Sequence, residues 1–194
     1  VHGNDPGNFA LDWTTLPAQL EKQQFVDLLP SVVIEHYRRL YPHYTASEVF
    51  FAATTAGRSW RGAVEELEAR ARQPAAAAPT WAYQLDGPSP VQEGRLRAFH
   101  PLDIPLVFDN AGLPTARTGG GADARALAAT MSDALVAFAR HGNPNHAGLA
   151  DWAPYTLPQR RTMLFDVRSR GADDPRGGER ELYQRVPFLQ RGTA

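Results

Sequence analysis

The sequence contains no cysteine, which excludes disulfide bonds and thiolate chemistry. It also contains no run approaching the roughly twenty apolar residues of a transmembrane helix, so it predicts no membrane span. Acidic and basic residues nearly balance at a formal net charge of -1, which gives no electrostatic case for a nucleic-acid partner. The opening residues have no charged leader or apolar signal region. They also lack an initiator Met, which indicates a cut inside a longer protein and leaves localisation open.

Lysine is nearly absent as well, because Lys22 is the only one and the other basic residues are arginines. The bias toward Arg and Ala favours a GC-rich bacterial source. Hydrophobic residues make up 43% of the 194 positions and charged residues 21%, which is typical of a soluble globular protein with one domain.

Several segments of the chain are predicted to be helical. Apolar residues at helical spacing predict helices over 18–29, 30–44, 45–55, 60–73 and 118–142. In the last of these we expect Leu127, Met131, Leu135 and Phe138 to form the buried stripe.

Strands are fewer. Alternation of large residues predicts one over 80–86, and an apolar run predicts another over 162–170, before a terminal helix or tail over 175–190. Two strands do not form a stable sheet by themselves. The chain is therefore interpreted as part of a fold whose other strands come from elsewhere.

Four ordered segments carry a family resemblance. They are "FHPLDIPLVFDN", "FARHGNPN", "DWAPY" and "RRTMLFD", all between residues 99 and 166. In this order they resemble the C-terminal portion of type-B carboxylesterases, the family that includes the cholinesterases. The resemblance implies an α/β fold: residues 1–194 would be the C-terminal part of a single α/β-hydrolase domain, made of helices and the last strands of a mostly parallel sheet.

The resemblance also implies catalytic roles. His100 matches the histidine of the catalytic triad, in the loop after a central strand, with the segment 104–108 packed behind it. It would act as general base for a serine and then as general acid for the leaving alcohol. Such chemistry needs no cofactor and no metal.

Asp5 is the residue implied as the triad acid, because it lies four residues before Phe9, as the family's Glu does before its Phe. Asp12 and Asp103 are the alternatives, and Asp103 aligns with an acidic residue that we interpret as structural. Asp in place of Glu and Pro101 in place of Gly are departures from the family pattern.

The nucleophile is missing from this sequence. There is no Gly-x-Ser-x-Gly motif, and the closest imitation, around Ser59, has the wrong spacing and is expected at a helix start, as a cap. The chain by itself is therefore predicted to be inactive. The resemblance implies the N-terminal portion of the same enzyme as partner, supplying the serine and the oxyanion hole, and a small carboxylic ester as substrate.

Three readings stay open. One is that Arg95 or Arg97, with Arg97 as the chosen candidate, faces the substrate cleft and favours an anionic ester; the competing interpretation is a solvated loop arginine. Another is a non-catalytic cholinesterase-like binding or adhesion module, or an inactive fragment. The third concerns the remaining histidines, whose spacing fits no metal site, so that packed or solvated roles are expected for His2, His36, His43, His141 and His146.

Overall fold

The computed structural model describes residues 2–74 and 78–188. The chain divides into two compact units, each with its own hydrophobic core. Unit 1 contains residues 1–69 and 176–194, and unit 2 contains residues 70–175. That residues 1–194 form part of a single domain stays a prediction.

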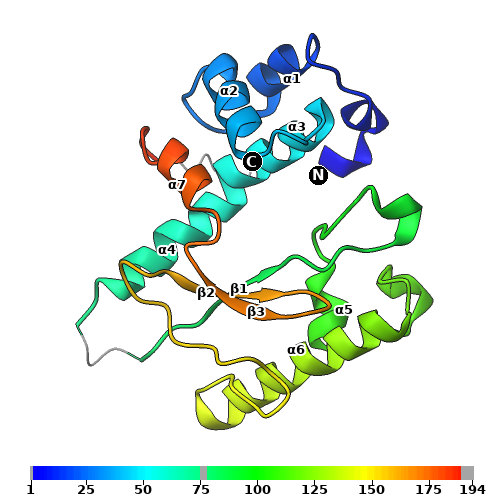
Figure 1. Ribbon diagram of the computed structural model, residues 1–194, viewed down its shortest axis with the longest axis vertical. Coiled ribbons are helices and arrows are strands. Elements are labelled where there is room, and N and C mark those ends of the chain that lie inside the picture. Colours follow the sequence, from blue (N-terminus) through cyan, green and yellow to red (C-terminus); the bar gives the residue numbers. More distant parts are fainter. Residues whose placement is uncertain (1, 75–77, 189–194) are drawn as a thin grey trace. The chain divides into compact units, whose positions relative to one another are not determined.

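Unit 1 is built from helices in the part of it that the structure describes (Figure 1). Two short 3-10 turns come first and are followed by helices α1 to α4, with a five-residue π-helix between α3 and α4. The C-terminal helix α7 completes the unit. The bounds are η1 (His2–Asn4), η2 (Pro6–Phe9), α1 (Leu16–Gln23), α2 (Pro30–Leu40), α3 (Ala46–Thr55), η3 (Ala56–Trp60), α4 (Arg61–Ala71) and α7 (Gly177–Tyr183).

Helix α3 begins at a capping box. The Thr45 hydroxyl accepts a hydrogen bond from the Glu48 backbone N–H at 3.3 Å, and the Glu48 carboxylate accepts one from the Thr45 N–H at 2.7 Å. These two bonds satisfy N–H groups that have no partner inside the helix. The predicted helix with its Thr/Ser start is confirmed here.

The π-helix joins α3 to α4 without a break in the helical ribbon. It brings Gly57 close to the rest of unit 1: a Cβ atom at this position would lie 3.0 Å from Val26 Cγ1 and 3.4 Å from Tyr183 Cε1. A larger residue here would require the Val26 side chain to shift by a few tenths of an ångström.

The core of unit 1 contains residues from α1, α2, α3 and α7, and its largest members are completely buried. Burying a Leu or Phe side chain contributes about 1.5–3 kcal/mol, so these helices stabilise one another by packing. The principal residues are Leu16, Leu20, Val33, Tyr37, Val49, Phe50, Leu182 and Tyr183.

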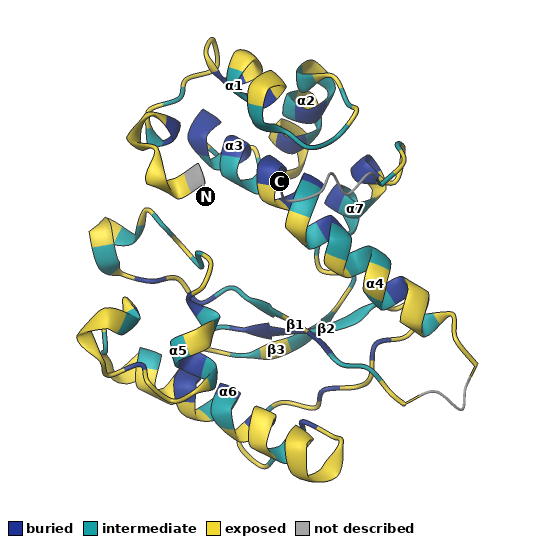
Figure 2. Ribbon diagram, turned by 180° about the vertical axis from the view of Figure 1, so that it is seen from behind, coloured by how far each residue is buried: buried dark blue, intermediate teal, exposed yellow. Residues whose placement is uncertain are grey.

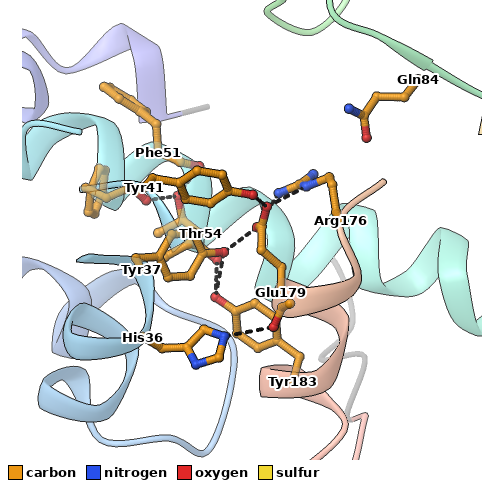
Figure 3. Close-up of polar contacts among 12 residues, drawn as sticks. His36, Tyr37, Tyr41, Phe51, Thr54, Gln84, Arg176, Glu179 and Tyr183 are labelled. Carbon is orange, nitrogen blue, oxygen red and sulfur yellow. Dashed lines mark hydrogen bonds and ion pairs between the residues drawn. The ribbon is translucent and has the colours of Figure 1, made fainter. Parts of the chain in front are cut away.

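A buried polar cluster attaches α7 to α2 (Figure 3). The Glu179 carboxylate accepts hydrogen bonds from the hydroxyls of Tyr37 and Tyr41, and it forms an ion pair with Arg176. The Tyr183 hydroxyl donates to the Ala53 carbonyl at 3.0 Å, which connects α7 to α3 as well.

Unit 2 contains a three-stranded sheet in the order β1-β2-β3. Strands β1 (Ala82–Leu85) and β2 (Arg161–Phe165) are parallel, with Tyr83 opposite Met163. Strand β3 (Arg170–Asp173) pairs with β2 in antiparallel direction, with Gly171 opposite Met163. The predicted strands over 80–86 and 162–170 are confirmed in part, since the second is β2 and its turn. Strand β3 was not predicted.

Two helices connect the parallel strands, α5 (Asp103–Val107) and α6 (Ala122–His141), and both pack on one face of the sheet (Figure 1). Short 3-10 turns, η4 (Val91–Gly94) and η5 (Pro114–Ala116), lie in the loops before them. The core between helices and sheet includes Leu102, Leu106, Leu127, Met131, Trp152, Met163 and Phe165.

The buried stripe predicted for α6 is confirmed at its first two residues and wrong at its last two. Leu127 and Met131 are buried, whereas Leu135 and Phe138 are 42% and 46% exposed. Phe138 nevertheless meets the Trp81 ring edge to face, with centroids 5.8 Å apart, so this part of α6 lies beside the start of β1 and is only partly covered by the described residues. Figure 2 shows much of the surface of α6 exposed.

Candidate active site

His100 lies in the loop that follows the carboxyl end of β1, and it is exposed. The turn around it is closed by a hydrogen bond of 2.7 Å from the Leu102 N–H to the Phe99 carbonyl. Ligands of open α/β sheets bind outside the carboxyl ends of parallel strands, so this is the end of the sheet at which chemistry is expected.

The residues just after His100 fix its turn to the core. Leu102 and Leu106 are both 2% exposed and pack with Ala128 and Met131 of α6. Of the segment 104–108, which was expected to pack behind the histidine, Leu106 is buried, whereas Ile104 and Phe108 are 53% and 64% exposed. An exposed histidine next to a buried support is accessible for proton transfer.

The loop before His100 is held by Ser89, which is 1% exposed. Its N–H donates to the Arg97 carbonyl at 3.1 Å, which closes the loop, and its hydroxyl donates to the Arg117 carbonyl. The Arg117 guanidinium in turn lies over the Phe99 ring, 4.7 Å from its centroid. The Arg117 cation is therefore held against Phe99, the residue that precedes His100 in the sequence. Neither Ser89 nor Arg117 was singled out from the sequence, because no local pattern indicates these pairings.

Asp103, one of the alternative acids, also lies in unit 2. It is the first residue of α5, and its carboxylate accepts a hydrogen bond of 3.2 Å from the Tyr83 hydroxyl of β1. Burial and, next, the negative charge of Asp103 raise the pKa of Tyr83. Asp103 thus connects α5 to the sheet, which agrees with its interpretation as structural.

Asp5, the predicted acid, belongs to unit 1, whereas His100 belongs to unit 2. Asp5 is exposed and caps η2: its Oδ1 accepts a hydrogen bond of 2.9 Å from the Gly7 N–H. Its pairing with His100 stays a prediction.

Asp12, the alternative acid, is occupied by the turn that leads into α1. Its Oδ1 accepts hydrogen bonds from the N–H and hydroxyl groups of both Thr14 and Thr15, at 2.6–3.0 Å. Led by the Thr14 hydroxyl, these bonds lower the pKa of Asp12 to about 2. This carboxylate has a structural role in the turn.

Arg97, the candidate substrate-binding residue, is exposed and has a positive φ of 49°. Its N–H donates to the Gly94 carbonyl at 3.0 Å, which tightens the loop before His100. Arg97 is thus three residues from the histidine in the same loop. Its contact with substrate stays a prediction.

Ser59 corrects one expectation. It does not cap a helix start, because it lies inside η3, in the middle of the continuous helix from α3 to α4. The apolar pattern breaks at the π-helix, and this break gives a false signal of a helix end in the sequence.

Of the other histidines, His36 and His146 bond to backbone groups, whereas His141 is exposed. The His36 Nε2 donates to the Gly178 carbonyl at 2.8 Å, and the His146 ring bonds to the Thr130 carbonyl and the Gly148 N–H. Across residues 2–74 and 78–188, no three His, Cys, Asp or Glu side chains gather as metal ligands would. Over the same residues, no helix combines the length and apolarity that a bilayer span requires.

The parallel strands joined by a histidine loop and a long helix form an α/β unit, and the solved structures that match the chain identify it as part of an α/β-hydrolase. A family model described as the carboxylesterase family matches residues 50–180. The chain therefore belongs to the carboxylesterase family. No curated protein matches it.

Solved structures of esterases are similar to the chain. Carboxylesterase EST55 of Geobacillus stearothermophilus is 29% identical with a TM-score of 0.76; the match covers 93% of this chain and 37% of that one. PNB esterase is 27% identical with a TM-score of 0.59, over 88% of this chain and 33% of that one. At 22% identity, an esterase of Clostridium hathewayi that can hydrolyze aliphatic aromatic polyesters shares the fold, with a TM-score of 0.58, over 92% of this chain and 34% of its own. The chain thus spans about a third of the length of these structures.

Proposed function

We propose that this chain is the part of a serine carboxylesterase that supplies the general base, His100, and its orienting acid, Asp5. The N-terminal portion of the same enzyme would supply the serine and the oxyanion hole, and a small carboxylic ester would be the substrate. The observation that carries the proposal is the position of His100: an exposed imidazole after the carboxyl end of a parallel strand, on a buried support, in a chain of the carboxylesterase family.

The reaction would proceed in two halves. In the first, the His100 imidazole takes the proton of the serine hydroxyl as the serine oxygen attacks the ester carbonyl carbon. The imidazolium then gives this proton to the leaving alcohol, and an acyl-serine forms. In the second half, His100 takes a proton from water, the hydroxide oxygen attacks the acyl carbon, and the proton returns to the serine as the acid leaves.

Asp5 would stabilise the imidazolium and hold the ring in one tautomer. Support for Asp5 over Asp12 comes from their hydrogen bonds. One oxygen of Asp12 accepts four bonds from its own turn, whereas Asp5 is exposed and accepts one from Gly7.

The first test is labelling of the complete native protein with a fluorophosphonate, which reacts with an activated serine. We expect label on the portion with the Gly-x-Ser-x-Gly motif, lost when His100→Ala is introduced. His141→Ala, at another exposed histidine, is the matched control and should label as the wild type does. No label on folded wild-type protein would overturn the proposal and favour a non-catalytic module or an inactive fragment.

The acid is tested by ester hydrolysis in the same protein. Asp5→Asn should lower kcat by on the order of 10⁴-fold, because the ring would lose its correct tautomer. Asp12→Asn should leave kcat close to that of the wild type. The reverse pattern would move the acid to Asp12.

Arg97 is proposed to face the substrate cleft and to favour esters with a negative charge. Arg97→Gln should then lower kcat/KM for an acidic ester relative to a neutral one. Arg95→Gln is the control, because the Arg95 guanidinium binds the Gln92 side chain within the same loop. An unchanged ratio in Arg97→Gln would leave Arg97 as a loop residue only.

A further inference from the structure

A pocket of unit 2 lies next to the loop of His100. It has a volume of about 370 Å³, within the roughly 300–1,000 Å³ that is usual for small-molecule sites. Its lining comes from two segments, residues 99–105, which lead into α5, and residues 110–117, which include η5. Phe99 and Pro101, the two neighbours of His100 in the sequence, both belong to the lining.

The walls of this pocket are mainly apolar and partly open to solvent. Ile104 from one segment and Leu113 from the other are 53% and 54% exposed, whereas Leu102, also in the lining, is 2% exposed. Transfer of apolar surface out of water is favourable, so a ligand with an apolar part would gain binding free energy by covering Ile104 and Leu113.

Arg117 is the one charged residue among the described residues of the lining. Its guanidinium lies over the Phe99 ring, and within residues 2–74 and 78–188 it has neither a hydrogen-bond acceptor nor an acidic partner. Asn110 and Thr115 add a side-chain amide and a hydroxyl to the same lining. The pocket therefore offers hydrogen-bond donors and a positive charge that no carboxylate of the described chain neutralises.

The backbone holds Arg117 in a defined position. Its φ of 57° lies in the left-handed region, and its carbonyl accepts a hydrogen bond from the buried Ser89 hydroxyl. The next residue is held as well, because the Thr118 hydroxyl donates to the Ala111 carbonyl at 2.6 Å. A side chain that is positioned in advance loses less conformational entropy when a ligand binds.

We propose that this pocket binds a small carboxylate with an apolar chain. The Arg117 guanidinium would hold the carboxylate by two parallel N–H···O bonds, the geometry that arginine favours, and Ile104 and Leu113 would cover the chain. Charge complementarity selects this class of ligand, since the lining combines apolar walls with one unneutralised cation. The site goes beyond the proposed function, because binding here requires no ester hydrolysis.

Titration calorimetry of the complete native protein with hexanoate tests the site. The protein is first treated with a fluorophosphonate, so that hexanoate cannot bind at an activated serine. We expect hexanoate to bind, and hexan-1-ol, which has the same chain length and no charge, to bind at least tenfold more weakly. Arg117→Gln should weaken hexanoate binding at least tenfold. Arg125→Gln is the matched control and should leave it unchanged, because Arg125 is exposed, lies outside the lining and donates to the Gly120 carbonyl.

Two further substitutions separate the ligand contacts from an effect on the fold. Arg117→Gly removes the guanidinium and suits the φ of 57° better than any other residue does, so a loss of binding here has no backbone strain behind it. Leu113→Asn should reduce the preference for hexanoate over acetate. Val167→Asn, at a position that is 61% exposed and outside the lining, should preserve that preference.

Three results would each overturn the proposal: no binding of hexanoate, equal binding of hexanoate and hexan-1-ol, or hexanoate binding that is unchanged in either Arg117 variant. Fluorophosphonate labelling of the wild type keeps this hypothesis apart from the proposed function. A labelled enzyme that does not bind hexanoate retains the function and loses only the pocket. An unlabelled protein that binds hexanoate through Arg117 retains the pocket and loses the function.

Discussion

The Tyr37 hydroxyl donates a hydrogen bond of 2.5 Å to the Glu179 carboxylate, across 142 residues of sequence. Glu179 is 2% exposed, and its charge is balanced by Arg176. Burial, followed by the negative charges that Tyr183 and Glu179 would present, raises the pKa of Tyr37, so its hydroxyl stays a donor. Burial opposes the charge of Arg176, but the hydrogen bonds and charge of Glu179 outweigh it and raise the pKa of Arg176. The C-terminal helix is thus held by a charged pair inside unit 1.

Removing the charge of Glu179 should destabilise unit 1. Glu179→Gln leaves Arg176, whose side chain is only 17% exposed, without its counter-ion, and loss of one partner of a buried pair costs roughly 3–5 kcal/mol of unfolding free energy at most. Urea unfolding followed by circular dichroism measures it. Glu181→Gln is the control on the same helix, since the Glu181 side chain is 69% exposed and its pair with Arg180 is long at 3.8 Å. A similar cost for both substitutions would contradict the buried-pair account.

The capping box of α3 gives a smaller and sharper prediction. Thr45→Ala removes the acceptor for the Glu48 N–H and should cost about 1 kcal/mol, whereas Thr45→Ser keeps the hydroxyl and should cost much less. Urea midpoints of the two variants, compared with the wild type, decide the matter. Equal losses would mean that the Thr45 methyl group, and not its oxygen, stabilises the helix start.

The lowered pKa of Asp12 predicts that the stability of the folded protein depends on pH. Its pKa in the folded protein is lowered to about 2 from an ordinary 3.8, so its contribution is fully present above about pH 4 and is lost as the pH falls toward 2. Asp12→Asn keeps an acceptor oxygen but has no charge to titrate. The difference in unfolding midpoint between wild type and Asp12→Asn should therefore shrink from pH 5 to pH 2. A constant difference would show that Asp12 has no lowered pKa.

The bond between Tyr83 and Asp103 predicts a small structural effect without a catalytic one. Tyr83→Phe removes the hydroxyl that bonds to Asp103 and should cost about 0.5–1.5 kcal/mol of stability. If the complete protein hydrolyses esters as proposed, we expect its kcat to stay within a few-fold of the wild type. A fall in kcat comparable to that of Asp5→Asn would instead place Asp103 in the catalytic machinery.

Local signals in the sequence predicted most of the helices and two of the strands. The Thr45 cap and the apolar spacing of 122–141 are properties of neighbouring residues, so they can be read without a structure. Strand β3 has the sequence "RGAD", which has neither alternation nor β-branched residues. It is a strand because β2 pairs with it, and a single sequence does not indicate that pairing.

In the candidate site, too, the features set by neighbouring residues could be predicted, and those set by distant contacts could not. His100 was found through motifs that surround it in the sequence, and its support by Leu102 and Leu106 follows from the apolar run after it. The exposure of Leu135 and Phe138 was not predicted, because helical spacing tells which residues share a face and not whether a partner covers that face. The contacts of Arg117 and Glu179 depend on residues far away in the sequence.

The π-helix has a consequence for insertions and deletions. A π-turn accommodates one more residue than an α-turn, and one residue corresponds to a rotation of about 100° about the helix axis. Deleting one residue from 56–60 would convert the π-turn into an α-turn, so α3 and α4 would form one regular helix without that rotation. Arg61 and Glu68, which share the buried side of α4, would keep their direction. A deletion inside α4 itself has no π-turn to absorb it and would rotate the residues after it by about 100°, so we expect single-residue deletions to be tolerated better at 56–60 than within α4.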